Sequence, residues 1–322
     1  MQRSSILITG GGGFIGSHIA AAVVAAGHRV VILEQREVVE PPSEAHVVCG
    51  DITEAGTWAS IPPCDVVFHA AGFTSAVESE QNPDGSYRTN VEGTQCVAAY
   101  ARLHGARVIF CSSIRVYDPD AVAEAMERRG VVNEDCALVR PDRTDQPPFT
   151  HHKRAAEQIL INANAYTGGV IIHRMSSVVG PGQRGREGHG WVAYLVQCAI
   201  DGRPYTIFGD GAQIRDPLHI DDLVQLVRME LTDWPQFSRP GGAIYNVGGG
   251  PRMALSVNDV IRILREDHGL TLRWEHGAER SGEPRHYIAD TTAVEQCGWS
   301  RRHEDSRDLI RDIVASHRSD AL

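Results

Sequence analysis

The sequence of 322 residues predicts an α/β fold, a doubly wound parallel sheet accompanied by a smaller α/β lobe. Short β-branched runs alternate with helical patterns through the first half of the chain, as strands and helices do in such a sheet. The strand segments are apolar almost throughout, which is typical of parallel strands covered by helices on both faces. The alternation weakens after residue 174, where Gly- and Arg-rich loops follow, and this change predicts a second lobe built from discontinuous segments.

The individual elements can be placed in order along the chain. Six strands are expected, at Ser5–Thr9, Arg29–Leu33, His46–Cys49, Val66–His69, Val108–Cys111 and Val170–His173. Apolar spacing of about 3.6 residues predicts three helices, at Ile15–Ala26, Tyr87–His104 and Lys153–Tyr166. Residues 119–147 are interpreted as an irregular insertion at a rim or lid, with one helical stretch at Ala121–Arg129. We expect one domain over 1–174, which the chain rejoins around 214–247, and the smaller lobe over 175–213 and 248–322.

Composition narrows the class of protein. The net charge of −10 argues against nucleic acid or an anionic membrane as the main partner. The longest apolar run, Ile19–Ala26, is far too short to span a bilayer. Seven scattered cysteines show neither a CxxC pair nor the spacing of a metal site, so we expect reduced, packed thiols and no bound metal. These features predict a soluble cytoplasmic protein.

A glycine-rich turn joins the first expected strand to the first expected helix. Gly10 permits a tight turn, Gly13 lets the backbone approach a pyrophosphate, and Gly16 lets the helix pack on the strand. Phe14 and Ile15 open the helix, whose first N–H groups would face the phosphates. The order of strand, glycine turn and helix predicts a dinucleotide site of the Rossmann type.

The second expected strand indicates which dinucleotide binds. It leads into Glu34, about 20 residues beyond the turn, where a carboxylate binds the ribose hydroxyls of the adenosine. An acidic group favours NAD, because it would repel the 2′-phosphate of NADP. Arg36 is a weak signal in the other direction, and we count it among the candidate cofactor contacts. We therefore expect NAD.

Three further motifs follow in order, Gly50-Asp51-Ile52, His69-Ala70-Ala71-Gly72 and Thr89-Asn90-Val91-x-Gly93-Thr94. With the glycine turn, they make the chain resemble the extended short-chain dehydrogenase/reductase family over nearly its whole length, in its nucleotide-sugar epimerase and dehydratase branch. The resemblance implies an adenine contact at Asp51 and further cofactor contacts at Ile52, Ala70, Ala71, Gly72, Asn90, Lys153 and Met175. Asn90 could instead bond only to backbone. The resemblance also implies a homodimer formed through the Tyr87–His104 and Lys153–Tyr166 helices.

The segment Cys111-Ser112-Ser113-Ile114-Arg115-Val116-Tyr117 resembles the family's serine-containing strand end. The resemblance implies that Ser113 hydrogen-bonds the reacting oxygen of a sugar. Dehydratases of this branch carry an acidic pair at the next two positions and decarboxylases a Glu, whereas this chain has Ile114 and Arg115. With no carboxylate there to move a C5 proton, a dehydratase is disfavoured. Arg115 either meets an anionic sugar substituent such as a uronate or points outward from the surface.

Phe149 stands where the family has a tyrosine. In the family, a lysine four residues later bonds the nicotinamide ribose and lowers the pKa of the phenol, which takes a proton from the sugar hydroxyl. Lys153 fits that role on the same helix face, but Phe149 cannot exchange a proton. Two explanations stay open: a Tyr→Phe change was introduced, or the natural protein uses Ser113, a water or a nearby histidine instead. His151 and His152 are expected to face solvent.

The smaller lobe carries the motifs that the family uses for its substrate. The resemblance implies substrate contacts at Thr74, Ser113, Arg115, Ser177, Thr206, Phe208, Arg215 and Arg280. Phe208 either stacks on the nucleotide base or packs in the core. Arg215 and Arg280 suit a diphosphate, because guanidinium groups donate paired hydrogen bonds. The run His219-Ile220-Asp221-Asp222 is expected to cap and orient the helix that follows.

The resemblance therefore implies an NAD-dependent 4-epimerase of nucleotide-diphosphate sugars, with a UDP-sugar as the preferred substrate. It would act through a transient 4-keto sugar, with turnover impaired by Phe149. Two alternatives stay open. One is an NAD(P)-dependent sugar-nucleotide ketoreductase or dehydrogenase, and the other is a catalytically silent protein that binds NAD or a sugar nucleotide.

Overall fold

The structure is a computed structural model that describes residues 3–279 and 282–319. The chain forms two compact units. The first unit comprises Met1–Val116, Pro147–Arg174 and Val224–Tyr245, and the second comprises Tyr117–Gln146, Met175–Leu223 and Asn246–Leu322. Within the described ranges, no helix has both the length and the apolar character needed to cross a membrane.

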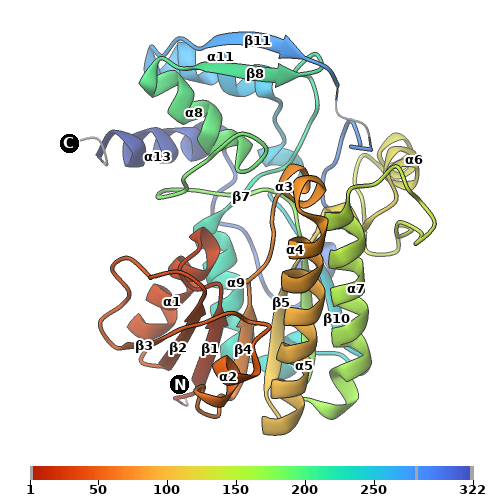
Figure 1. Cartoon of the computed structure of the whole chain (residues 1–322). Coiled ribbons are helices and arrows are strands. Elements are labelled where there is room, and N and C mark those ends of the chain that lie inside the picture. Colours follow the sequence, from red (N-terminus) through yellow and green to blue (C-terminus); the bar gives the residue numbers. More distant parts are fainter. Residues whose placement is uncertain (1–2, 280–281, 320–322) are drawn as a thin grey trace. The chain divides into compact units, whose positions relative to one another are not determined.

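A seven-stranded sheet forms the centre of the first unit (Figure 1), with the strand order β10-β6-β5-β4-β1-β2-β3. β1 pairs in parallel with both β2 and β4, and β2–β3 and β4–β5 are parallel as well. The strands are β1 (Ser5–Thr9), β2 (Arg29–Glu34), β3 (Ala45–Cys49), β4 (Val66–His69), β5 (Arg107–Ser113), β6 (Val170–Met175) and β10 (Ala243–Val247). The predicted doubly wound parallel sheet is confirmed.

The strand order reverses beside β1. The chain runs outward from β1 through β2 to β3 and then returns to the other side of β1 with β4. In an open parallel sheet, such a switch point opens a crevice at the carboxyl ends of the strands, where ligands bind. The topology therefore places a candidate site at the ends of β1 and β4.

Helices connect these strands, and α5 and α7 lie side by side (Figure 1). The helices of this part of the chain are α1 (Phe14–Ala25), α2 (Ala55–Ala59), α3 (Ala76–Gln81), α4 (Pro83–Tyr87), α5 (Gly93–His104), α7 (Pro148–Ala163), α9 (Ile220–Thr232) and α10 (Trp234–Phe237). Two 3-10 turns occur at Ile114–Val116 and Asn164–Tyr166.

Two expected helices have different bounds in the structure. The helix expected at Tyr87–His104 is α5 preceded by a π-helical turn, Arg88–Glu92. Such turns insert an extra residue and are frequent at functional sites. The helix expected to begin at Lys153 begins five residues earlier, at Pro148, because proline suits the first helical position, where no N–H is needed.

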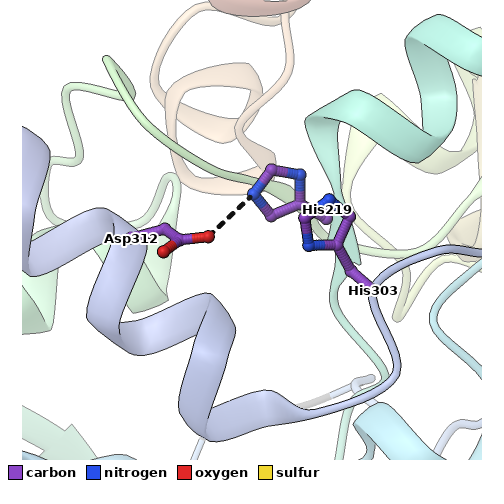
Figure 2. Close-up of side chains that lie close together, drawn as sticks. All are labelled: His219, His303 and Asp312. Carbon is purple, nitrogen blue, oxygen red and sulfur yellow. Dashed lines mark ion pairs between the residues drawn. The ribbon is translucent and has the colours of Figure 1, made fainter.

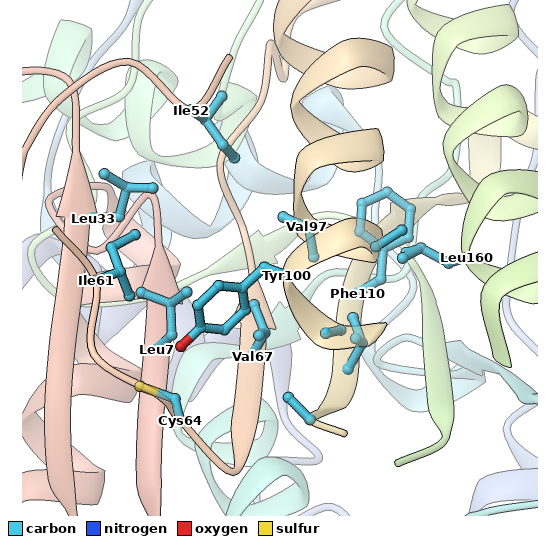
Figure 3. Packing of buried hydrophobic residues seen from close by; sticks show 14 of the residues in the cluster. Leu7, Leu33, Ile52, Ile61, Cys64, Val67, Val97, Tyr100, Phe110 and Leu160 are labelled. Atoms are coloured by element: carbon cyan, nitrogen blue, oxygen red, sulfur yellow. The ribbon is translucent and has the colours of Figure 1, made fainter. Parts of the chain in front are cut away.

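The core of the first unit lies between the sheet and the helices that include α5 and α7 (Figure 3). Leu7, Val67 and Phe110 come from three neighbouring strands, and Val97 and Leu160 come from α5 and α7. All five side chains are essentially buried, so the apolar strand pattern is explained by helices packed against it.

The second unit contains two small parallel sheets, β8 (Pro204–Phe208) with β11 (Arg273–Gly277), and β7 (Val178–Val179) with β9 (Leu218–His219). Its helices are α6 (Pro119–Arg129), α8 (Trp191–Asp201), α11 (Val257–His268), α12 (Thr292–Glu295) and α13 (Ser306–Ser319), with a 3-10 turn at Pro251–Met253. α8, α11 and α13 pack around a core of their own. The insertion expected at 119–147 folds as part of this unit, where Arg143 binds Asp118, Asp120 and Asp145 at 2.8–2.9 Å.

Candidate functional site

The glycine turn leaves space where side chains would obstruct it. Gly10 has a φ of +73°, and a Cβ there would lie 2.7 Å from the N atom of Ala71. A Cβ at Gly16 would lie 2.2 Å from the carbonyl oxygen of Gly10, so α1 can start beside the turn only with glycine. Gly13 precedes α1, and Phe14 and Ile15 are its first, half-buried residues. The loop therefore forms a narrow backbone cradle at the switch point.

Two acidic side chains are held at the ends of β2 and β3. The Glu34 carboxylate accepts hydrogen bonds from the N–H groups of Gly12 at 3.1 Å and Gln35 at 2.9 Å, so it lies at the glycine turn. Asp51 accepts the Thr53 N–H at 2.8 Å, and this hydrogen bond lowers the pKa of Asp51. Gln35 also donates to Asp51 at 3.2 Å. Glu34 and Asp51 are therefore preoriented, charged acceptors at one edge of the sheet.

The other predicted cofactor residues lie at or near the same edge. Ala70, Ala71 and Gly72 follow β4 directly, and Met175 ends β6. Ile52 is buried against Gly93, whose added Cβ would lie 2.7 Å from its Cγ2 atom. Arg36 and Thr74 are exposed in the loops after β2 and β4.

Asn90 presents a buried acceptor in the π-helical turn. Its side-chain NH₂ donates to the Phe73 carbonyl at 3.3 Å, but no donor among the described residues reaches its buried Oδ1. That oxygen is 2.5 Å from where a Cβ of Gly72 would stand, and the Lys153 Nζ is 3.5 Å from the same point. An unpaired buried acceptor costs about 1–3 kcal/mol. Asn90 therefore faces the end of β4 with an oxygen suited to a ligand donor.

Lys153 and Phe149 lie on the buried face of α7. The ammonium of Lys153 donates to the Cys111 carbonyl at 2.8 Å and lies 4.8 Å from the centre of the Phe110 ring. Burial lowers the pKa of Lys153 to about 8. Phe149 is 4% exposed, and its N–H donates to the Ser79 hydroxyl at 3.1 Å. The positively charged ammonium group of Lys153 therefore lies at the end of β5.

A buried ion pair fixes α7 against the sheet. Glu157, four residues after Lys153, accepts Arg174 at 2.8 Å and the Ser112 hydroxyl at 2.5 Å. Glu157, Arg174 and Ser79, whose hydroxyl binds the start of α7, are not among the site residues predicted from the sequence. The spacing of Glu157 from Lys153 was a readable signal for a third buried residue on that helix face.

Ser113 closes β5, and the adjoining turn carries Arg115. The Ser113 oxygen accepts the Arg115 N–H at 3.2 Å, and both residues are half-buried. The expectation that His152 faces solvent is wrong, because its Nδ1 lies 2.9 Å from the Ser86 hydroxyl and its ring packs edge-on to Tyr87. Burial lowers the pKa of His152. His151 is half-buried as well.

The predicted substrate residues of the second unit have partners within that unit. Thr206 lies 3.5 Å from Glu275 across β8 and β11, and Phe208 packs beside Gly277. The Arg215 guanidinium donates to the Ile214 carbonyl at 2.8 Å and lies 3.6 Å from Glu283. Ser177 accepts the indole N–H of Trp191 at 3.3 Å. Arg280 lies outside the described residues.

Within the described ranges, one group of side chains has metal-ligand chemistry: His219, His303 and Asp312 of the second unit (Figure 2). The centres of the two imidazole rings lie 3.7 Å apart and their planes are nearly parallel, at 10°, so their in-plane lone pairs lie in two separate planes and do not meet at one ion. His219 Nδ1 accepts the Asp221 N–H at 3.1 Å, which leaves its proton on Nε2, 3.9 Å from Asp312. This ring arrangement therefore does not match the converging ligand geometry of a metal site.

Asp222 acts differently from the helix cap expected of it. The start of α9 is capped by His219, which accepts the Asp221 N–H. The Asp222 carboxylate instead accepts the N–H groups of Arg302 at 2.8 Å and His303 at 3.2 Å. Asp222 therefore fixes a distant loop, whereas His219 has the expected capping role.

The chain is similar to known proteins in both sequence and structure. The sequence model of the NAD dependent epimerase/dehydratase family matches residues 6–248. A UDP-glucose 4-epimerase of Azospirillum brasilense is 30% identical, with 98% of this chain and 92% of that protein covered. A CDP-paratose 2-epimerase of Salmonella typhi is 25% identical, with 92% and 94% covered. The solved structure of MoeE5 in complex with UDP-glucuronic acid and NAD is 28% identical, with a TM-score of 0.85 and 98% and 99% of the two chains covered.

Proposed function

Since the chain belongs to the NAD dependent epimerase/dehydratase family and is thus an NAD-dependent enzyme, we propose that it is a 4-epimerase of nucleotide-diphosphate sugars. The proposed reaction passes through a transient 4-keto sugar. UDP-sugars are the preferred substrates, because a UDP-glucose 4-epimerase is similar to this chain over 98% of its length.

The residues at the carboxyl edge of the sheet fit NAD. The glycine turn leaves its backbone open for a pyrophosphate, and the Glu34 carboxylate lies at that turn with acceptor capacity for ribose hydroxyls. Asn90 Oδ1 is buried and lacks a donor among the described residues, so a donor of the cofactor would satisfy it. When bound, the cofactor would supply the hydride acceptor as NAD⁺ and the hydride donor as NADH. The carbonyl of Cys111 holds the Lys153 ammonium, which we propose turns to a ribose hydroxyl.

Two neighbouring residues favour epimerisation over dehydration. Ser113, at the end of β5, is proposed to hydrogen-bond the reacting sugar oxygen. The residues that follow it are Ile114 and Arg115, so no carboxylate of this turn is available to remove a C5 proton. The absence of an acid beside Ser113 is the observation that carries the choice of reaction. Arg115 adds a cation that would suit a uronate.

Phe149 leaves the site without a general acid–base group at this position of α7. Its ring is buried on the same face of α7 as Lys153, but it has no proton to give or take. General acid–base catalysis contributes about 10²–10⁴-fold to a rate. We therefore propose that this chain binds cofactor and substrate and turns over slowly.

In the second unit, we propose that Thr206, Phe208 and Arg215 contact the nucleotide part of the substrate, together with Ser177 and Arg280. The Arg215 side chain is 15% exposed and paired with Glu283, so an incoming diphosphate would replace a carboxylate that the guanidinium already binds. We also propose a homodimer, which the exposed apolar side chains of Leu103 on α5 and Tyr166 after α7 support. Light scattering behind size-exclusion chromatography tests the dimer.

One experiment separates the candidate functions. The substrates are UDP-glucose, UDP-galactose and the corresponding uronates, UDP-glucuronate and UDP-galacturonate. Each is incubated with NAD and either the unchanged chain or the Phe149→Tyr variant, and the products are resolved by chromatography. We expect interconversion of 4-epimers by the variant, and far less by the unchanged chain. Net accumulation of NADH would instead indicate a dehydrogenase, a second candidate. Binding without turnover in both proteins would indicate a silent binder, which Phe149 itself favours.

A further inference from the structure

His69, the last residue of β4, is completely buried at the carboxyl edge of the sheet. Its Nδ1 lies 2.7 Å from the Thr9 hydroxyl and its Nε2 lies 3.0 Å from the Thr94 hydroxyl. The Thr94 hydroxyl donates to the Asn90 carbonyl at 2.6 Å, and the Ala71 N–H donates to the Thr9 oxygen at 3.3 Å. These contacts form one buried hydrogen-bonded chain from the end of β4 to the π-helical turn.

Only one placement of hydrogens satisfies that chain. The Asn90 carbonyl can only accept, so the hydroxyl hydrogen of Thr94 is committed to it and the Thr94 oxygen must accept from His69 Nε2–H. His69 Nδ1 then has a free lone pair, to which the Thr9 hydroxyl donates. The Thr9 oxygen is left to accept the Ala71 N–H. The ring is therefore neutral, with its proton on Nε2.

Three cofactor-facing segments meet at this histidine. Thr9 immediately precedes Gly10 of the glycine turn, and Ala71 N is the atom that a Cβ on Gly10 would strike. Asn90 carries the buried oxygen that faces Gly72. The His69 ring also stacks on Phe110 at 5.2 Å, with an interplanar angle of 27°, and Lys153 lies over that same Phe110 ring.

We propose that His69 is a positioning residue for NAD, which sets the relative places of the glycine turn, the Ala70–Gly72 segment and the Asn90 turn without touching the cofactor. A neutral imidazole suits this role because it donates at one nitrogen and accepts at the other. Protonation would make both nitrogens donors and would put a second cation near Lys153. Burial, followed by the charge of Lys153, lowers the pKa of His69 to about 3, in agreement with the neutral ring.

The first test is made on the unchanged chain. Long-range ¹H–¹⁵N NMR of protein labelled at histidine reports which ring nitrogen carries the proton, and the His69 signal is assigned by its loss in a His69→Phe variant. We expect a proton on Nε2 and a bare Nδ1. A proton on Nδ1 would overturn the proposed chain of hydrogen bonds.

The second test measures NAD affinity in folded variants. His69→Phe keeps a ring beside Phe110 and loses both hydrogen bonds, and Thr94→Val removes one hydroxyl at constant shape. We expect each variant to raise the Kd for NAD roughly tenfold, because the net contribution of a hydrogen bond between neutral groups is of that order. The double variant should be no worse than the poorer single variant, because both break one chain.

A matched control separates positioning from general stability. His28 is also buried, but it lies outside the sheet, just before the first residue of β2, and accepts the Ser4 N–H at 3.2 Å. His28→Phe should lower the free energy of unfolding and leave the Kd for NAD unchanged. An unchanged Kd in both folded His69→Phe and Thr94→Val, or an equal rise in His28→Phe, would overturn the inference.

This inference rests on NAD binding at the carboxyl edge, and its failure is distinguishable from failure of the proposed function. If the unchanged chain binds NAD but neither it nor the Phe149→Tyr variant produces an epimer, the proposed reaction fails and the positioning role stands. If the NMR signal shows the other tautomer while epimerisation occurs, the positioning role fails alone.

Discussion

Lys153 and Phe149 stand four residues apart on the buried face of α7, and only the lysine carries a group that can hold or release a proton. The lysine is fixed from two sides, by the Cys111 carbonyl at 2.8 Å and by the Phe110 ring. The phenylalanine is fixed through its backbone, by the Ser79 hydroxyl. The helix therefore holds a buried cation and, four residues before it, a buried ring that carries no ionisable group.

Restoring a phenol at position 149 is expected to make the turnover depend on pH. Lys153, whose pKa is about 8, would stabilise a nearby phenolate and lower the pKa of that phenol. In Phe149→Tyr, kcat should rise about 10²–10⁴-fold and should increase with pH as the phenol ionises. In Phe149→Tyr with Lys153→Met, the rise with pH should shift to higher pH. An identical profile with and without the lysine would contradict the coupling.

Removing the Glu34 carboxylate is expected to relax the preference for NAD. Glu34 lies at the glycine turn, where it would repel a 2′-phosphate, so Glu34→Ser should raise the affinity for NADP and lower that for NAD. Calorimetric titration with both cofactors measures the ratio of the two Kd values, and we expect it to change by tenfold or more, about 1.4 kcal/mol. Glu37→Ser removes an exposed acid three residues further on and should leave the ratio as it was. An unchanged ratio in Glu34→Ser would count against the assigned role.

Breaking the Arg174–Glu157 pair is expected to destabilise the first unit strongly. Both side chains are buried, and loss of one partner leaves an uncompensated charge, which costs about 3–5 kcal/mol. Arg174→Met should therefore lower the free energy of unfolding in urea by that amount, and Arg174→Met with Glu157→Met should recover much of it. Arg262→Met breaks an exposed pair with Asp259 and should cost less than about 1 kcal/mol. A double variant as unstable as the single one would argue against an uncompensated charge as the cause.

Acid is expected to destabilise the protein partly through His69. In the folded chain burial lowers the pKa of His69 to about 3, while in the unfolded chain it returns to 6.5. Below 6.5 the unfolded state binds a proton that the folded state refuses, so stability is complete above that pH and is lost as pH falls toward 3. The slope for this one group is at most about 1.4 kcal/mol per pH unit.

The measurement for this prediction is the free energy of unfolding in denaturant at several pH values within that window. The difference between the unchanged chain and His69→Phe isolates the contribution of His69, because the other titrating groups are common to both proteins. The unchanged chain should lose stability more steeply than the variant as pH falls. Parallel curves would show that His69 takes up its proton equally in both states.

Much of the first unit could be predicted because its signals are local. The alternation of apolar runs with helical patterns predicted six of the seven strands of the central sheet, since each strand's composition follows from being covered on both faces. The place of the edge strand β10 beside β6 could not be read from the sequence, because it depends on a chain crossover. The π-helical turn at Arg88–Glu92 could not be recognised from the spacing of the apolar residues.

The candidate site likewise contains some features that the sequence predicts and others that only the folded structure brings together. Gly10, Gly16 and Glu34 could be read from the sequence because a tight turn, a close helix approach and a strand-end acid each demand a residue type at a fixed spacing. Nothing in the sequence linked His69 to Thr9 and Thr94, which are 60 and 25 residues away. The tautomer of His69 and the pairing of Glu157 with Arg174 depend on which buried polar groups meet across strands and helices. Residue types and spacing thus determined the family and the cofactor. Only the tertiary structure decided how buried donors and acceptors are matched, because each match requires groups that the chain brings together only when it folds.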